Sequence, residues 1–276
     1  MSAINVMVNG LPGNVAVTVA KHIHADDRLN LIPFSLTGPE IEYPEHVLDG
    51  VIVKLVRPDI REKEITTIKA RYPGLISVDY THPTAVNDNA AFYCRHGLPF
   101  VMGTTGGDRA LLLDTVTRAA LPAVIAPNMA KQIVGLQAIM EYAAREFPGL
   151  FSGYSLEVKE SHQQGKADTS GTAKAMVQYF NKMGISFSAN DIIMERDPKK
   201  QKTEWGVPEE YIKGHAWHTY TLISKDKTVK FAFTHNVNGR DVYALGTVDA
   251  ILFLQQKIKA CAAGKVYSMI DVLRGK

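Results

Sequence analysis

The sequence has few cysteines and no dominant charge of either sign. Cys94 and Cys261 are the only cysteines among 276 residues, so a disulfide framework and a cysteine-based zinc site are both excluded. Lys and Arg total 31 against 28 Asp and Glu, a formal net charge of +3. Basic residues are spread evenly apart from Lys199, Lys200 and Lys202, so a nucleic-acid surface is not indicated. These features favour a protein of a reducing compartment.

Long hydrophobic runs are also missing. The most apolar stretch, residues 244–254, is interrupted by Gly246 and Asp249 and falls short of the ~20 residues that cross a bilayer. The first ten residues lack the basic and apolar regions of a secretory signal, and a strand-like run starts at Ile4. We therefore expect no membrane association, and a cytoplasmic protein, or a stromal one if an organelle transit peptide has been removed.

The N-terminal half alternates short apolar runs with helical patterns, which is typical of a parallel sheet covered by helices. Strands are predicted at residues 4–8, 29–36, 51–56, 75–80, 99–102 and 123–126, and helices at 14–24, 59–71, 83–96 and 108–120. The sequence therefore predicts an α/β fold whose Rossmann-like domain comprises residues 1–128.

A second, α+β domain is predicted for residues 129–240. It should contain long helices at 130–147 and 171–183, a strand at 154–161, and an antiparallel hairpin of strands 215–223 and 229–237. We expect residues from about 241 to 276, a helix at 245–261 and a short tail, to pack back on the first domain. We expect the hairpin to expose three apolar residues, Tyr220, Phe231 and Phe233. Such an exposed apolar face suggests sheet-to-sheet contact between subunits.

A glycine-containing loop follows the first strand directly. Gly10, Leu11, Pro12, Gly13, Asn14, Val15 and Ala16 form a Gly-x-x-Gly-x-x-Ala pattern that leads into an apolar helix. The glycines allow a tight turn and close approach of the backbone to a pyrophosphate, and the helix N-terminus offers free N–H groups. A plain turn without ligand is the alternative.

Three further segments should complete the dinucleotide site. Ser35 and Thr37 stand where NAD-preferring proteins carry an acidic residue, which favours NADPH, although no Arg adjoins them, Glu40 is close by, and NADH is possible. Two other segments also end strands at the edge where open α/β sheets bind ligands. They are Gly103, Thr104 and Thr105, and Ala126, Pro127, Asn128 and Met129. A simple β–α turn is the alternative for the first of these two.

Residues 160–173 contain the most candidate catalytic and substrate-binding groups of any segment of the sequence. His162 titrates near neutral pH and can donate a proton, and Lys166 adds a positive charge. Thr169 or Ser170 is suited to cap the following helix, whose Gly171 and Thr172 N–H groups can receive a carboxylate. The alternative is a capped helix with an exposed His and Lys.

This segment resembles the Glu-x-His-His-x-x-Lys-x-Asp-x-Pro-Ser-Gly-Thr-Ala signature of dihydrodipicolinate reductases. The resemblance includes the glycine loop, Asp79-Tyr80-Thr81, Gly103-Thr104-Thr105-Gly106, Ala126-Pro127-Asn128-Met129 and Gly239-Arg240, and its details look like the plant-type branch. It implies NADPH- or NADH-dependent reduction of a cyclic dicarboxylic imine in diaminopimelate and lysine biosynthesis. It also implies a dimer or tetramer whose two domains close over the substrate.

The resemblance also implies roles for particular residues. His162 matches the family's general acid, and Lys166 the residue that binds substrate and assists protonation. Ser170, Gly171 and Thr172 match the cradle for a substrate carboxylate. Residues 10–15, 103–105 and 126–129 match coenzyme contacts. Gln163 and Thr169 stand where the bacterial signature has His and Pro, and the Gln163 amide can still donate a hydrogen bond to the substrate.

Other functions remain open at this point. A dinucleotide-sensing protein without turnover would share the first domain, and another NAD(P)H-dependent imine or amino-acid dehydrogenase would share the architecture. His215 and His218 invite a metal interpretation, but on a strand they point to opposite faces and have no third ligand nearby in sequence. We therefore predict no metal site.

Overall fold

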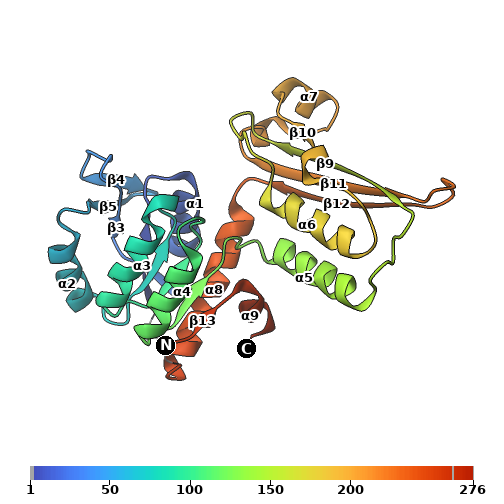
Figure 1. The fold of residues 1–276 in the computed structure, drawn as a ribbon. Helices are drawn as coiled ribbons and strands as arrows, with labels where there is room; N and C mark the ends of the chain where they lie inside the picture. The colour runs from blue at the N-terminus through green and yellow to red at the C-terminus, as the bar shows by residue number, and fades with distance from the viewer. Residues whose placement is uncertain (1–2, 263, 276) are drawn as a thin grey trace. The chain divides into compact units, whose positions relative to one another are not determined.

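The computed structural model describes residues 3–262 and 264–275 (Figure 1). It divides into two compact units, Met1–Val134 with Asp241–Lys276, and Gly135–Arg240. Among the described residues, no helix combines the length and apolarity that a membrane crossing requires.

A parallel six-stranded sheet forms the centre of the first unit. Its strand order is β13-β8-β7-β6-β1-β2, and every pairing in it is parallel. The strands are β1 (Ile4–Asn9), β2 (Leu29–Leu31), β6 (Ile76–Asp79), β7 (Phe100–Met102), β8 (Ala123–Ile125) and β13 (Val266–Tyr267). The predicted Rossmann-like α/β architecture is confirmed, and the C-terminal β13 completes one edge of the sheet beside β8.

Helices cover both faces of this sheet. Val6 and Val8 pack with α1 (Asn14–His24) and α8 (Asp241–Lys259) in one core, whereas Met7 belongs to a second core on the opposite face, because successive side chains of a strand alternate. The second core contains residues of α2 (Arg61–Arg71), α3 (Val86–Arg95) and α4 (Arg109–Arg118). The remaining elements are η1 (Pro83–Ala85), which leads into α3, and the C-terminal α9 (Met269–Arg274).

The predicted strand at residues 29–36 is wrong as one element. The chain pairs with β1 as far as Leu31, and after Pro33 it forms β3 (Phe34–Leu36), which pairs with β5 (Val51–Val56) in a separate sheet of order β3-β5-β4. Pro33 has no N–H to donate and interrupts the ladder. The strand β4 (Glu45–Leu48), rich in polar residues, was not predicted.

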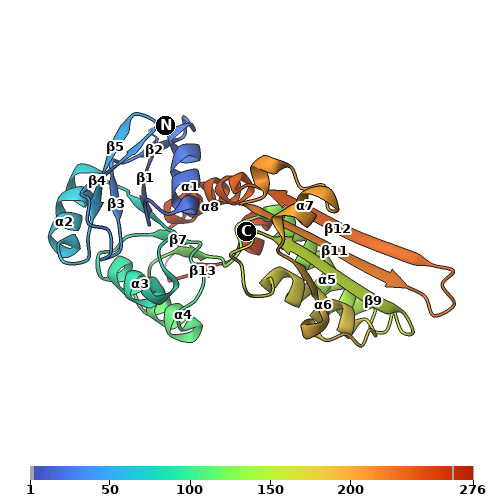
Figure 2. The same ribbon diagram turned by 90° about the horizontal axis from the view of Figure 1, so that it is seen from above.

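A four-stranded sheet forms the centre of the second unit, in the order β10-β9-β11-β12. The antiparallel pairing of β11 with β12 confirms the predicted hairpin. The helices α5 and α6 lie along the same face of the sheet (Figure 1), and Figure 2 shows the length of the hairpin. The elements are α5 (Lys131–Glu146), β9 (Ser155–His162), α6 (Gly171–Lys182), η2 (Ala189–Asp191), β10 (Ile193–Glu195), α7 (Pro198–Thr203), η3 (Glu209–Tyr211), β11 (His215–Ile223) and β12 (Lys230–Asn238).

The expectation that Tyr220 is exposed is wrong. Its side chain is fully buried in the core between the sheet and α6, where its ring packs on Phe180 at a centroid distance of 5.8 Å. Phe233 is partly buried against the same core, and Phe231 is exposed. Period-two alternation assigns residues to two faces, but it does not say which face the helices cover.

Candidate active site

The glycine loop after β1 is shaped by close backbone contacts. Gly10 has φ +100°, and a Cβ there would overlap the carbonyl oxygen of Tyr80, so no other residue fits. The Gly13 N–H donates to the Gly10 carbonyl (2.8 Å), and Gly13 is the N-cap of α1, whose first turn has no acidic residue. The loop thus presents the N-terminus of an 11-residue helix, which suits a phosphate group.

This loop forms one wall of a cavity of about 880 Å³. Of the residues predicted to bind coenzyme, Gly10, Leu11, Pro12, Gly13, Asn14 and Thr37 line it. The other predicted residues, Val15, Ser35, Gly103–Thr105 and Ala126–Met129, are not among its described lining residues. The size, the glycine cradle and the helix terminus fit a nicotinamide dinucleotide.

The two predicted hydroxyl residues support the loop. Ser35 is fully buried, and its hydroxyl accepts a hydrogen bond from the Leu11 N–H (3.3 Å). Thr37 donates to the Leu11 carbonyl (2.8 Å). Glu40 lines the cavity, and its carboxylate occupies the space where a side chain on Gly38 would lie. The charged residues that line the cavity include Arg61 and Asp88 as well as Glu40.

A buried carboxylate connects the loops at the sheet edge. Asp79, at the end of β6, accepts hydrogen bonds from Thr104 (2.5 Å), Thr81 (2.8 Å), Asn89 (3.0 Å) and Tyr93 (2.6 Å). Burial, followed by the charge of Asp79, raises the pKa of the Tyr93 hydroxyl well above its ordinary value. The hydroxyl of Thr104, a predicted coenzyme contact, therefore donates to Asp79, and this hydrogen bond holds the loop after β7 in place.

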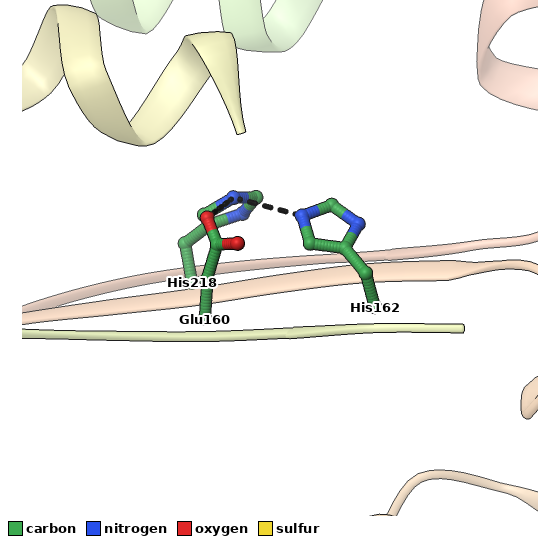
Figure 3. A group of neighbouring side chains, drawn as sticks. All are labelled: Glu160, His162 and His218. Atoms are coloured by element: carbon green, nitrogen blue, oxygen red, sulfur yellow. Dashed lines mark hydrogen bonds and ion pairs between the residues drawn. The ribbon is translucent and has the colours of Figure 1, made fainter. Parts of the chain in front are cut away.

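In the second unit, His162 lies at the end of β9 beside two other polar side chains (Figure 3). Its Nε2 atom is 3.3 Å from Nε2 of His218, and His218 Nε2 is 3.7 Å from Oε2 of Glu160. His162 is 6% exposed, His218 2% and Glu160 0%. Glu160 and His162 are two residues apart and share a face of β9, and the register places His218 of β11 opposite Glu160.

Glu160 and Arg196 form an ion pair that organises this region, with the carboxylate fully buried and the guanidinium half-buried. The guanidinium donates to Glu160 Oε1 at 2.5 Å and to the main-chain carbonyl of Lys166 at 2.8 Å. The other carboxylate oxygen of Glu160 accepts the N–H of Ser170 at 3.0 Å. Gln201 donates to the carbonyl of His162 at 2.6 Å. Together these contacts fix the segment from His162 to the start of α6.

Burial keeps both histidines of the cluster neutral. Burial, and then the charges of Arg196 and Lys166, lower the pKa of His162 to about 4. For His218, burial and the neighbouring His235 and His162 lower the pKa to about 2. Both imidazoles are thus uncharged at pH 7, and a negatively charged ligand beside His162 would favour its cationic form.

The predicted substrate residues surround the start of α6. Ser170 is its N-cap, with Gly171 and Thr172 in the first turn, so their N–H groups are free of intrahelical partners. Lys166 pairs with Asp168 at 2.7 Å, and its main-chain N–H donates to the main-chain carbonyl of Gln163. The structure therefore places Gln163, Lys166 and the helix terminus on the segment that follows His162.

Sequence patterns did not reveal Glu160, Arg196, Gln201 or His218 as parts of this site. Glu160 is the first residue of the segment quoted above, and it lies two residues before His162. On a strand this spacing places both side chains on one face, so it could have indicated that Glu160 lies beside His162. Arg196, Gln201 and His218 are far from His162 in the sequence, and long-range pairing alone brings them together.

Two family models cover most of the chain. Residues 4–129 match dihydrodipicolinate reductase, N-terminus, and residues 133–273 match dihydrodipicolinate reductase, C-terminus. The chain belongs to the dihydrodipicolinate reductase family. The resemblance drawn from its motifs is thereby confirmed, as is the prediction of an NAD(P)H-dependent oxidoreductase.

Individual relatives agree with the family. The chain is 49% identical over 273 residues to 4-hydroxy-tetrahydrodipicolinate reductase 2, chloroplastic, of Arabidopsis thaliana, covering 99% of this chain and 78% of the relative. It is 28% identical to a 4-hydroxy-tetrahydrodipicolinate reductase of Nostoc sp., covering 90% and 92%. The fold is similar to that of dipicolinate-bound dihydrodipicolinate reductase from Paenisporosarcina sp. TG-14, with a TM-score of 0.66, 17% identity, and 96% and 97% coverage.

Proposed function

We propose that this protein reduces the cyclic imine derived from 4-hydroxy-tetrahydrodipicolinate to tetrahydrodipicolinate, with His162 as the general acid. The observation that carries the proposal is a buried imidazole on the segment that leads to the N-terminus of α6, in a chain whose other unit holds a dinucleotide cradle. When bound, the coenzyme supplies the hydride. The protein's own residues then have to hold the substrate and deliver one proton.

The α6 terminus and Lys166 are suited to hold a substrate carboxylate. Free N–H groups at a helix N-terminus bind anions, and Gly171 has open space where a side chain would lie, so a carboxylate can approach the backbone. Lys166 can exchange its exposed partner Asp168 for the substrate, because the Asp168 side chain is 76% exposed and the pair is screened by water. Gln163 can add a hydrogen bond from its amide.

Binding of a dicarboxylate should prepare His162 for proton donation. In the ligand-free protein Arg196 and Lys166 help to keep the imidazole neutral. A substrate with two negative charges offsets these cations and raises the pKa of His162 toward neutral pH, where an acid works best. Water leaves the region as the substrate enters, which strengthens each of these electrostatic interactions.

The choice of coenzyme depends on the charges around Thr37. We keep NADPH as the favoured coenzyme and NADH as a second one, since Ser35 and Thr37 bring no charge. Glu40 acts against a 2′-phosphate, because its carboxylate lines the cavity beside Gly38.

Replacing Glu40 by glutamine is expected to raise the kcat/KM ratio of NADPH over NADH by about tenfold, corresponding to about 1.4 kcal/mol. The measurement is steady-state oxidation of both coenzymes by the unaltered protein and by Glu40→Gln. Glu45→Gln is a suitable control, since Glu45 lies on the exposed edge strand β4 and should leave the ratio unchanged. An unchanged ratio in Glu40→Gln would remove Glu40 from coenzyme selection.

The assembly and the location of the protein belong to the same proposal. We propose a homo-oligomer, a dimer or tetramer, because β12 is a nine-residue edge strand with Phe231 exposed.

The plant relatives are named chloroplastic, which supports an organelle stroma as the place of action, with the cytoplasm as the alternative.

The function is tested by supplying the purified chain with the product of pyruvate and aspartate semialdehyde condensation, made in situ by its synthase. We expect rapid oxidation of NADPH or NADH that depends on this product. Coenzyme binding without oxidation would favour a dinucleotide sensor. Oxidation with an amino-acid-derived imine instead would favour another dehydrogenase of the same architecture.

A further inference from the structure

The cluster of Glu160, His162 and His218 has an arrangement that proton transfer does not require. The two imidazoles point their Nε2 atoms at each other, 3.3 Å apart (Figure 3), and a carboxylate oxygen of Glu160 lies 3.7 Å from one of them. One donor atom from each of the three residues lies within 4.8 Å of the other two. All three side chains are buried.

The separation of the two histidine nitrogens matches the coordination shell of a zinc ion. Zn–N bonds of about 2.0–2.1 Å at a tetrahedral angle place two nitrogen ligands about 3.3–3.4 Å apart, which is the separation of the two Nε2 atoms. Glu160 Oε2 is 3.7 Å from Nε2 of His218 and has to approach it by a few tenths of an ångström to reach the same geometry. The ligand atoms of Glu160 and His162 lie within 4.8 Å of each other and also have to move closer together. Two His and one Glu with an open fourth position form a ligand set typical of Zn²⁺.

The hydrogen-bonding capacity of the cluster also suits a metal. A neutral imidazole has one N–H and one nitrogen with a free lone pair. In the metal-free protein, one proton can lie between the two Nε2 atoms. If each ring instead carries its proton on Nδ1, both Nε2 lone pairs are free to bind a metal ion. Nδ1 of His218 is buried and has no hydrogen-bond partner among the described residues, so nothing there prevents it from carrying the proton.

Neighbouring charges set the strength of binding. Arg196 holds Oε1 of Glu160, and the Ser170 N–H donates to Oε2 at 3.0 Å, which orients the carboxylate as hydrogen bonds to ligating carboxylates commonly do. Oε2 keeps a second lone pair and lies 3.7 Å from Nε2 of His218. The same guanidinium repels a cation, and Nδ1 of His218 lacks a stabilising acceptor among the described residues. Both effects make binding weaker than at a structural zinc site.

We propose that Glu160, His162 and His218 form a Zn²⁺-binding site, in which Nε2 of His162 coordinates the metal. The consequence for activity rests on the proposed function. A metal on His162 removes the proton donor, so added Zn²⁺ inhibits the reductase, and a chelator restores its activity.

The test measures binding to the whole, substrate-free protein, since the substrate's carboxylates would chelate the metal. The chelator-treated chain is titrated with Co²⁺, whose visible absorption reports four-coordinate geometry, and then with Zn²⁺ by calorimetry. We expect one ion per chain, and a Kd raised at least about tenfold, or about 1.4 kcal/mol, in His218→Gln. His215→Gln is the matched control, because His215 lies on the same strand but bonds to Ser161 and Tyr211 with its two nitrogens.

The two variants distinguish Zn²⁺ binding at this cluster from binding to other histidines of the chain. Loss of binding in His218→Gln with retention in His215→Gln supports the proposal. Equal binding in both variants, or no binding by the unaltered protein at millimolar metal, overturns it. If His218→Gln does not fold, ¹⁵N imidazole NMR of the unaltered protein decides, since Zn²⁺ must shift the Nε2 signals of His162 and His218 and spare His215. Turnover without metal is measured separately, so a failure of the proposed function is distinguishable.

Discussion

Replacing His162 by glutamine is expected to lower kcat by about 10²–10⁴-fold, the usual contribution of a positioned general acid. Glutamine preserves hydrogen bonding but cannot supply a proton at this position. Coenzyme affinity should be unchanged, because the glycine loop and its cavity lie in the other unit. The measurement is steady-state turnover together with fluorescence titration of the coenzyme. His215→Gln serves as the control, and turnover within a few fold of the unaltered protein in His162→Gln would exclude His162 as the acid.

The same residue predicts the pH dependence of the reaction. Because the pKa of His162 in the ligand-free protein is lowered to about 4, kcat/KM should fall as pH rises through the neutral range. The kcat profile should fall at a higher pH, because the bound dicarboxylate favours the imidazolium form. Identical profiles for kcat and kcat/KM would contradict protonation that is coupled to substrate binding.

The buried histidines also make folding pH-dependent. His162 and His218 bind no proton in the folded state until pH falls to about 4 and about 2, whereas in the unfolded chain they protonate near pH ~6.5. Between these values the unfolded state binds more protons, so the free energy of unfolding decreases as pH falls below about 6.5.

The second large effect concerns Arg196. Arg196→Met leaves the fully buried Glu160 carboxylate without its cation, and breaking a buried pair in this way costs about 3–5 kcal/mol. We expect the free energy of unfolding to fall by this amount in urea titrations monitored by circular dichroism. The loop from Gln163 to Asp168 should also loosen, since Arg196 holds the Lys166 carbonyl.

A double variant distinguishes the charge from the packing. Glu160→Gln combined with Arg196→Met removes both charges, and the introduced amide oxygen can still accept the Ser170 N–H, so much of the lost stability should return. Lys202→Met is the control, because its pair with Glu209 is exposed on both sides and contributes about 0–1 kcal/mol. A loss below about 1 kcal/mol in Arg196→Met would show that water reaches the Glu160 carboxylate.

Local patterns were sufficient for much of the fold and for one half of the site. The residues from Gly10 to Val15 are contiguous, and the reason for their glycines, a tight turn into a helix, is itself local. The helix predicted over residues 108–120 is a further example, since the Asp108 side chain caps α4 by accepting the Leu111 N–H. The break at Pro33 was equally local, but the apolar residues on both sides of it concealed two strands that belong to different sheets.

The sequence by itself determined the α/β order, the phosphate loop and the segment that carries His162 and Lys166, because each of these depends on neighbours within a few residues. The tertiary structure decided which groups surround His162. Arg196 and His218 reach it through the pairing of β10 and β11 with β9, and a shift of that register by one residue would turn His218 to the opposite face. Burial, which neutralises the histidines and makes the Glu160–Arg196 pair costly to break, likewise exists only in the folded chain.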